Sequence, residues 1–356
     1  MVKAVEQRVS QTIRAAQGVL AEKAVARQYA LKPERWKPYG GVGREKSVRD
    51  VGYHLSYLSE AIAAADTTLF VEYIKWAQVL FAELGFSEEV LPTTISCIGD
   101  VLGETLQAEM MDVVRPHLQA GLQQARSAYR PVPSFMTNDQ PLSAMAQRYL
   151  EVLLRGERHV ASRMILDAVE QGTPVRDIYL HVFQPAQREV GRLWQTSQIS
   201  VAREHYVTAA TQLIMSQLYP RIFGSEKTGR RLVATCVGGE LHEIGVRMVA
   251  DFFEMEGWDT TYLGANTPTA GVLQMLADRK ADVLAISATM TPHIDAVAEM
   301  IARVRASDVG NVRILVGGYP FNLSPDLWKR LGADACAQDA EKAVFVANQL
   351  ADSEDA

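Results

Sequence analysis

A single histidine, His242, stands between two acids in the string Thr-Cys-Val-Gly-Gly-Glu-Leu-His-Glu-Ile-Gly that ends at Gly245. The apolar run Leu232–Val237 before it predicts a buried strand, and a helical pattern begins at Gly245. We therefore expect His242 in the loop at the carboxyl end of a first strand, where open α/β sheets bind ligands. A neutral imidazole at this position suits the axial coordination of a metal held in a flat macrocycle.

The acids beside this histidine suggest how its ring is oriented. Either Glu240 or Glu243 could hold the second ring nitrogen and raise the basicity of the imidazole. The alternative is a polar loop histidine without a ligand, because histidine is common in loops.

A second polar group lies in the segment from Gly191 to His205. Trp194 is expected at the end of one helix, and Glu204 and His205 in the first turns of the next, after a serine cap. The indole and the two polar side chains could then converge on one wall of a ligand cavity. The alternative is that Trp194 packs between two helices and that Glu204 and His205 are solvated.

Residues 230–350 supply the elements that would position His242. Apolar runs alternate there with helical patterns, which indicates a parallel, doubly wound sheet. The predicted strand ends carry small residues that leave space at the carboxyl edge. A dinucleotide site is the competing interpretation, but Gly-x-Gly-x-x-Gly is absent after the first strand. The small residues are Gly238, Gly239, Ser287, Ala288, Gly317 and Gly318.

The rest of the chain is predicted to be helical. Residues 1–130 form an all-helical domain of globin-like size, interrupted by a turn-rich connector, Leu31–Gly43. Three prolines in residues 127–141 mark a domain boundary. Four amphipathic segments with short connections then predict an antiparallel four-helix bundle. The predicted fold is α + α/β, with domains at 1–130, 140–225 and 230–352.

Aromatic residues surround a second histidine, His54, in the first domain. Tyr57 lies one turn away, and Tyr73 and Trp76 follow in the next helix. With nearby basic side chains they could hold a flat conjugated anion such as a tetrapyrrole. Plain core packing is the alternative, because aromatic residues dominate protein cores.

Composition limits the class of protein. The 356 residues are 48% hydrophobic and 22% charged, as in an ordinary soluble protein. No apolar run approaches the roughly 20 residues of a membrane span, and the first residues lack the pattern of a signal peptide. Three widely spaced cysteines favour a cytoplasmic protein without a disulfide framework. A net charge of −6 without a basic block gives no support to DNA binding.

Together these strings resemble a cobalamin-binding module. The motif of that family is Asp-x-His-x-x-Gly, a serine at the end of the third strand and Gly-Gly after the fourth. The resemblance implies that His242 is the lower cobalt ligand and that the nucleotide tail threads past the small residues. Glutamate replaces aspartate at position 240. The matching residues are Gly239, Glu240, His242, Gly245, Ser287, Thr289, Gly317 and Gly318.

The helical segment resembles the Trp-x9-Glu-His signature of light-sensing cobalamin regulators of the CarH type. There, Trp194 and Glu204 would enclose the 5′-deoxyadenosyl group above cobalt, and light would release it and shift the bundle. The chain departs at Gln195, where that family has the histidine that captures cobalt after photolysis. His205 is the nearest substitute.

The first domain resembles photocobilins, which join a cobalamin module to a bilin-binding region. This implies biliverdin as a second chromophore, with His54 and Tyr57 in the walls of its site. The resemblance as a whole implies an adenosylcobalamin photoreceptor rather than an enzyme. It would form a homodimer or homo-oligomer, signal to an unidentified downstream protein, and bind neither DNA nor membranes. The alternative is a corrinoid carrier protein for a methyltransferase system, which would have an open upper face.

Overall fold

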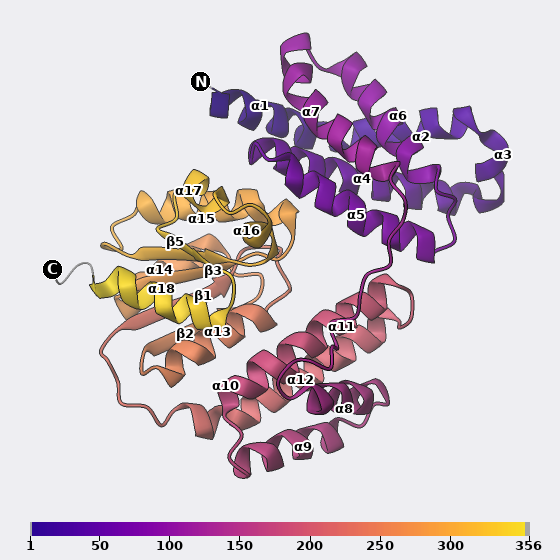
Figure 1. Ribbon diagram of the computed structural model, residues 1–356. Helices are drawn as coiled ribbons and strands as arrows, with labels where there is room; N and C mark the ends of the chain where they lie inside the picture. Colours follow the sequence, from indigo (N-terminus) through magenta and orange to yellow (C-terminus); the bar gives the residue numbers. More distant parts are fainter. Residues whose placement is uncertain (1, 353–356) are drawn as a thin grey trace. The chain divides into compact units, whose positions relative to one another are not determined.

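The computed structural model describes residues 2–352, which form two compact units (Figure 1). Unit 1 contains the chain up to Arg130 together with Met290–Asp295 and Leu323–Arg330, and unit 2 contains the remainder. No described helix is long and apolar enough to cross a membrane.

Unit 1 confirms the predicted helical N-terminal region. Buried apolar side chains such as Leu55, Phe70 and Ile98 face inward from successive helices. The first helical stretch is divided at Ala16 into two helices. The helices are α1 (Val2–Ala15), α2 (Gln17–Leu31), α3 (Pro33–Trp36), the 3₁₀ turn η1 (Lys37–Tyr39), α4 (Gly40–Ala63), α5 (Thr67–Glu83), α6 (Val90–Thr105) and α7 (Ala108–Ala125).

The connector predicted as a turn-rich loop is largely helical instead. Pro33 occupies the first position of α3, where the missing N–H has no helical partner to lose. The glycines from Gly40 onward begin α4. Trp36 is buried and stacks on Tyr29, with ring centroids 4.8 Å apart. The aromatic residues of the connector therefore pack on the neighbouring helices.

The first part of unit 2 is helical. Tyr149, Tyr179 and Phe183 are fully buried in its core, and the rings of Tyr149 and Phe183 lie 5.4 Å apart. A π-helical turn lies between two of the helices. The elements are α8 (Ser143–Leu154), α9 (Arg158–Glu170), α10 (Val175–Ile178), the π turn η2 (Tyr179–Phe183), α11 (Gln184–Gln195) and α12 (Val201–Ile222).

The second part of unit 2 is built on a sheet of five parallel strands in the order β2-β1-β3-β4-β5, as the apolar runs predict. The carboxyl ends of four strands lie in register, because Cys236 pairs with Ser287, Ser287 with Gly317 and Gly317 with Ala337. The strands are β1 (Arg231–Cys236), β2 (Asp259–Gly264), β3 (Val283–Ser287), β4 (Arg313–Gly317) and β5 (Ala335–Ala337).

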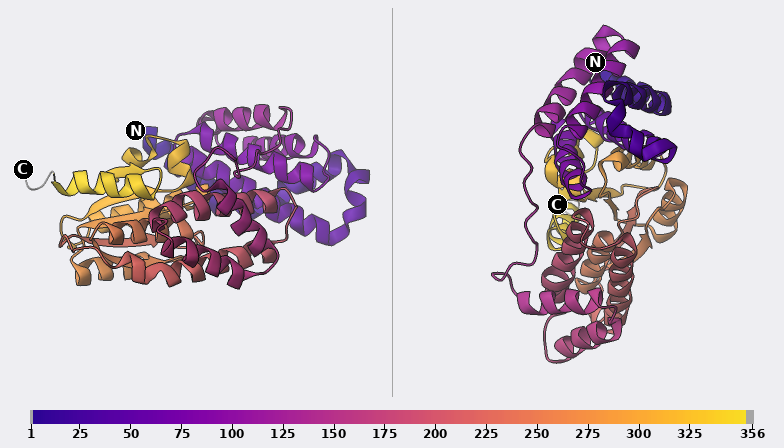
Figure 2. Two further views of the ribbon diagram at one scale, coloured as in Figure 1. Left: turned by 60° about the horizontal axis from the view of Figure 1, so that its bottom comes forward. Right: turned by 90° about the vertical axis from the view of Figure 1, so that its right-hand side faces the viewer.

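Helices cover the sheet on both faces (Figures 1 and 2). Alternate residues of β1, Leu232, Ala234 and Cys236, point into one hydrophobic core with α13, α18 and the helices α8–α12. The bundle and the sheet therefore share a core within unit 2. The helices of this part are α13 (Ile244–Met255), α14 (Thr269–Arg279), α15 (Ile294–Arg305), α16 (Tyr319–Leu323) and α18 (Ala340–Asp352), whereas the 3₁₀ turn η3 (Thr291–His293) and most of α17 (Leu327–Leu331) belong to unit 1.

Candidate functional site

The loop after β1 lies at the point where the strand order reverses, since β1 pairs with both β2 and β3. Open α/β sheets bind ligands in the crevice at such a point. Gly239 adopts a φ of 85°, and its N–H donates to Asn266 Oδ1 over 2.7 Å. The N–H of Asn266 donates in turn to the carbonyl of Glu240 over 2.9 Å. The loop after β2 thus holds the loop after β1 in a fixed shape.

Glu240 is completely buried and joins two strand ends. Its Oε1 accepts from the backbone N–H of His242 at 3.0 Å and lies 2.6 Å from Nδ1 of the same residue. Its Oε2 accepts from the backbone N–H of Thr289, in the loop after β3, over 2.7 Å. A carboxylate withdrawn from water needs such partners, because an unpaired buried charge is strongly disfavoured.

His242 is oriented by this carboxylate. The hydrogen bond to Glu240 raises the pKa of His242, burial opposes the rise, and the charges of Glu240 and Glu204 add to it. Because Nδ1 is held by Glu240, Nε2 is the nitrogen that a metal can bind. The side chain of His242 as a whole is 59% exposed. A neutral imidazole tied to a buried carboxylate is the usual donor arrangement of a metal-binding histidine.

Glu243 does not take part in orienting His242. Its Oε1 accepts from Gln212 Nε2 of α12 over 2.7 Å. Its Oε2 accepts from the hydroxyl of Tyr262 at 2.8 Å and from the N–H of Ala265 at 3.0 Å. Burial, with the nearby Glu243 carboxylate, raises the pKa of Tyr262. The structure therefore assigns Glu240 to the imidazole and Glu243 to the bundle, and sequence reasoning missed Gln212 and Tyr262.

The double glycine lies beside the loop after β3. A Cβ on Gly318 would approach the carbonyl oxygen of Ala288 to 2.0 Å, and its φ is 109°. A Cβ on Gly317 would lie 3.1 Å from the carbonyl oxygen of Ala337. Backbone packing thus requires glycine at position 318 and leaves little room for a side chain at position 317. Ser287 and Thr289 are half-buried nearby, and Gly245 has open space around its Cα.

The predicted bundle residues lie where α11 ends and α12 begins. Trp194 is half-buried and Gln195 is buried. Glu204 Oε2 lies 2.5 Å from His205 Nδ1, and Oε1 accepts from Thr208 over 3.1 Å. His205 itself is 74% exposed. The charge of Glu204 is one of the causes that raise the pKa of His242.

His54 and Tyr57 belong to unit 1. His54 is 2% exposed, its Nδ1 lies 2.7 Å from the hydroxyl of Tyr73, and burial lowers its pKa to about 4. Tyr57 stacks on Tyr73 at a centroid distance of 3.7 Å. His54 is therefore neutral at pH 7, within an aromatic cluster.

Comparison with known families shows cobalamin-binding domains in this chain. Residues 230–346 match the B12 binding domain, and residues 145–219 match a second family described as a B12 binding domain. The two segments contain all the predicted site residues of unit 2. The prediction of a cobalamin-binding module is confirmed at this level.

Several curated relatives are corrinoid proteins. The chain is 25% identical to dimethylamine corrinoid protein 3 of Methanosarcina acetivorans over 195 residues, covering 52% of this chain and 89% of that protein. It is 28% identical to monomethylamine corrinoid protein 1 of Methanosarcina mazei over 196 residues, covering 52% and 88%. The structure of the monomethylamine corrinoid protein of Methanosarcina barkeri shares the fold, with a TM-score of 0.53, 21% identity and coverage of 59% and 100%.

These relatives show that the prediction of a photoreceptor is wrong. They are named for methylamines, which supports the alternative of a corrinoid carrier. The error has a physical source in the short Trp-x9-Glu-His signature. A tryptophan near a helix end and a glutamate in a first helical turn are also favoured by packing and by the helix dipole. The residue that separates the light-sensing group, a histidine at position 195, is glutamine here.

Proposed function

We propose that this chain is a corrinoid carrier that holds its cofactor through His242 and presents it to a methyltransferase. The methylamine corrinoid proteins to which it is similar support this function. The observation that carries the proposal is the Glu240 carboxylate, which is completely buried, accepts from the N–H of Thr289 and holds Nδ1 of His242. Such an arrangement leaves one oriented imidazole nitrogen for a metal.

The residues at the carboxyl edge fit a corrinoid. When bound, the cofactor would supply a cobalt atom that takes up and releases a methyl group. His242 would bind that metal through Nε2, while Glu240 keeps the proton at Nδ1 and fixes the plane of the ring. Ser287 and the pair Gly317-Gly318 keep the neighbouring strand ends free of large side chains, as the nucleotide tail of a corrinoid requires.

Residues of the helical bundle would shield the face of the cofactor at which the methyl group is taken up and released. Trp194 supplies an apolar surface and Glu204 a carboxylate held by Thr208. In this proposal the partner methyltransferase is the catalyst, and the chain itself is not an enzyme. An adenosyl upper ligand, biliverdin in unit 1 and a homodimer stay untested predictions.

Isotope labelling tests the cobalt ligand. The full-length protein, reconstituted with hydroxocobalamin and reduced to the cobalt(II) state, is expected to show nitrogen hyperfine splitting in its electron paramagnetic resonance spectrum. Because ¹⁵N has half the nuclear spin of ¹⁴N, protein made with ¹⁵N-histidine should convert the triplets into doublets. The His242→Ala variant should lose this response. Triplets that persist in labelled protein would mean that the benzimidazole of the cofactor remains on cobalt, and would overturn the proposal.

Methyl transfer tests the carrier role. Protein loaded with methylcobalamin and kept in the dark should lose its methyl group to a thiol faster when a corrinoid-dependent methyltransferase is added. Free methylcobalamin at the same concentration is the control. Equal rates for the free and the protein-bound cofactor would contradict a role in presenting the cofactor.

A further inference from the structure

Four ring side chains gather between two helices of unit 1. His54 and Tyr57 lie three residues apart on α4, and Tyr73 and Trp76 lie three residues apart on α5. Each pair therefore shares one face of its helix. The ring of Tyr73 stacks on that of Tyr57 with a centroid distance of 3.7 Å, and on that of Trp76 with a centroid distance of 6.3 Å. Tyr73 is thus the central ring of a stack of three.

The hydroxyl of Tyr73 is hydrogen-bonded to a base. Its oxygen lies 2.7 Å from Nδ1 of His54, and burial lowers the pKa of His54 to about 4, so the imidazole is neutral at pH 7. A phenol is a stronger acid than a neutral imidazole, and we therefore assign the hydroxyl as the donor and Nδ1 as the acceptor. Burial also raises the pKa of Tyr73 well above its usual value, so the phenol keeps its proton at neutral pH.

Two buried tyrosines of unit 2 show what is particular about Tyr73. The hydroxyl of Tyr149 lies 2.9 Å from the hydroxyl of Thr211, which is not a base at neutral pH. Tyr179 donates to a carboxylate of Asp251, but its ring contacts are with phenylalanines, which are much harder to oxidise than tyrosine or tryptophan. Tyr73 combines a base at its hydroxyl with neighbouring rings that can be oxidised.

The stack also connects a buried ring to the surface. Tyr73 is 7% exposed, whereas Trp76 is 37% exposed. An oxidant in solution therefore meets the indole of Trp76 rather than the phenol of Tyr73. Because the two rings are stacked neighbours with an angle of 20° between their planes, an electron can pass from Tyr73 to Trp76 in one step.

We propose that Tyr73 is a redox-active tyrosine, which gives one electron to an oxidant at the surface and its proton to His54. The electron leaves through the ring of Trp76, and the O–H bond of Tyr73 breaks as an N–H bond forms at Nδ1 of His54. The oxidant is a one-electron acceptor, such as a metal complex or a small inorganic radical. The products are a neutral tyrosyl radical, an imidazolium and the reduced acceptor. This activity is independent of the proposed carrier function.

The surroundings of His54 favour return of the proton. Burial without a paired anion makes the imidazolium unfavourable, so His54 gives the proton back when Tyr73 regains an electron. Nε2 of His54 has no hydrogen-bond partner among the described residues, and the second proton of the imidazolium therefore has no neighbour to receive it. The buried radical is also shielded from coupling with a second phenoxyl radical. Tyr73 would hold one oxidising equivalent reversibly.

Rapid mixing with tris(bipyridine)ruthenium(III) tests the assignment. Full-length protein would be mixed with an equimolar amount of this oxidant, frozen after increasing times and examined by electron paramagnetic resonance. We expect a long-lived tyrosyl radical, whose spectrum narrows in protein made with ring-deuterated tyrosine. Tyr73→Phe should lose the long-lived signal. Tyr57→Phe, which keeps the stacked ring, and Tyr179→Phe should retain it. A long-lived signal in Tyr73→Phe equal to that of the wild type would overturn the proposal.

His54→Gln tests the base. The amide oxygen of glutamine can accept from Tyr73 but does not take up a proton at neutral pH. The radical should therefore form about 100-fold more slowly. The wild type gives a second readout that needs no variant, because formation should be slower in deuterium oxide if the proton moves with the electron. Equal rates in the two solvents, or in His54→Gln and the wild type, would contradict proton transfer to His54.

Trp76→Phe tests the route to the surface. The variant keeps an aromatic ring beside Tyr73 but makes that ring hard to oxidise, so the long-lived radical should form several times more slowly. Tyr53→Phe is the matched control, because Tyr53 is a 54% exposed tyrosine on α4 and its loss should leave the rate unchanged. Equal rates in Trp76→Phe and the wild type would overturn the assigned route.

Discussion

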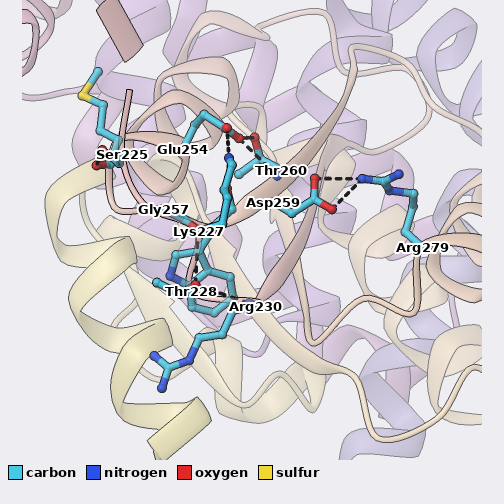
Figure 3. A network of polar contacts seen from close by, with 11 residues as sticks. Ser225, Lys227, Thr228, Arg230, Glu254, Gly257, Asp259, Thr260 and Arg279 are labelled. Atoms are coloured by element: carbon cyan, nitrogen blue, oxygen red, sulfur yellow. Dashed lines mark hydrogen bonds and ion pairs between the residues drawn. The ribbon is translucent and has the colours of Figure 1, made fainter. Parts of the chain in front are cut away.

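At the amino ends of β1 and β2, charged side chains pair with each other, whereas at the carboxyl ends a buried carboxylate pairs with an exposed histidine. Figure 3 shows the amino ends, where Glu254 forms an ion pair with Lys227 and accepts from the hydroxyl of Thr260 over 2.7 Å. Arg279 donates to both carboxylate oxygens of Asp259 at 2.8 Å. These polar groups pair with one another.

The contrast separates two uses of a buried carboxylate. Glu254 is 6% exposed and fixes the segment before β1 to the turn before β2, where the N–H of Thr228 donates to the carbonyl of Gly257 over 2.9 Å. Glu240 is equally withdrawn from water, but one of its partners is the imidazole of His242, whose side chain is 59% exposed. The first arrangement joins two segments of the fold, and the second is the one that the proposed function assigns to a metal ligand.

The largest expected effect is the loss of stability in a variant that disturbs backbone packing at the carboxyl edge of the sheet. Gly318→Ala combines a positive φ of 109° with an overlap of 2.0 Å against Ala288, so it should lower the free energy of unfolding by roughly 3 kcal/mol or more. Gly245→Ala is the control, since its Cβ would meet nothing within 4 Å and its effect should stay within about 0.5 kcal/mol. Urea unfolding curves measure both, and similar midpoints for the two variants would contradict the packing requirement.

Replacement of Glu240 tests the functional side of the comparison. Glu240→Gln removes the negative charge that raises the pKa of His242, so the imidazole becomes a weaker donor. The affinity for hydroxocobalamin should fall by about 10- to 100-fold, as for other partners of metal-bound histidines. Equilibrium dialysis measures this change. An affinity equal to that of the wild type would show that the carboxylate is only structural.

Asp251 lies on α13 and is a third buried carboxylate of unit 2. It is 6% exposed and accepts from the hydroxyl of Tyr179 over 2.8 Å, and burial raises its pKa from 3.8 to about 6 although Tyr179 and the charge of Arg247 act against the rise. The folded protein therefore holds this proton at pH values where the unfolded chain has lost it. The resulting stability is present below pH 3.8 and is lost as the pH rises through about 6.

The variant Asp251→Asn isolates this contribution. Between pH 4 and 6.5 the wild type should lose about 2 kcal/mol of stability relative to Asp251→Asn, which keeps an acceptor for Tyr179 but does not titrate. Urea unfolding at several pH values gives the difference directly. Parallel stability curves for the two proteins would show that Asp251 does not titrate in this range.

At the amino edge, Glu254→Gln should reduce stability and leave the cofactor unaffected. The loss of the ion pair with Lys227 should cost about 1–2 kcal/mol, because Lys227 is half-exposed and can return to water. Hydroxocobalamin affinity should match that of the wild type. A fall in affinity as large as that of Glu240→Gln would remove the distinction between the two edges.

The local sequence pattern was sufficient to predict the sheet, but it was not sufficient to predict which side chains contact one another in the site. The strands were predictable because apolar runs alternate with helical patterns, and the strand ends lie in register at the edge where His242 was expected. The choice between Glu240 and Glu243 was not predictable, because it depends on the path of a short loop. Gln212 lies 31 residues before Glu243, and no local periodicity connects the two.

The predictions of a loop at Leu31–Gly43 and of a photoreceptor were wrong for different reasons. Glycine and proline predicted a loop at Leu31–Gly43, but proline is tolerated in a first helical turn, and the aromatic residues found packing partners. The photoreceptor was inferred from the three residues of the Trp-x9-Glu-His signature and from aromatic residues around His54, and neither pattern is long enough to distinguish groups that share one cofactor. The cobalamin prediction involved motifs on three strand ends, which the fold brings together.

The smallest effect is expected at the surface pair of the amino edge. Arg279→Ala removes a bidentate contact to Asp259, but the two side chains are 42% and 47% exposed, so the loss of stability should be only about 0.2–1 kcal/mol. Arg303→Ala is a matched control with a single, longer contact to Glu299 of 3.8 Å, and its effect should be smaller still. Because both pairs face water, 1 M salt should remove most of the difference. A salt-independent loss above about 1 kcal/mol for Arg279→Ala would mean that the ion pairs of this edge act as one network, in which Asp259 also supports the buried Glu254 contact beside it.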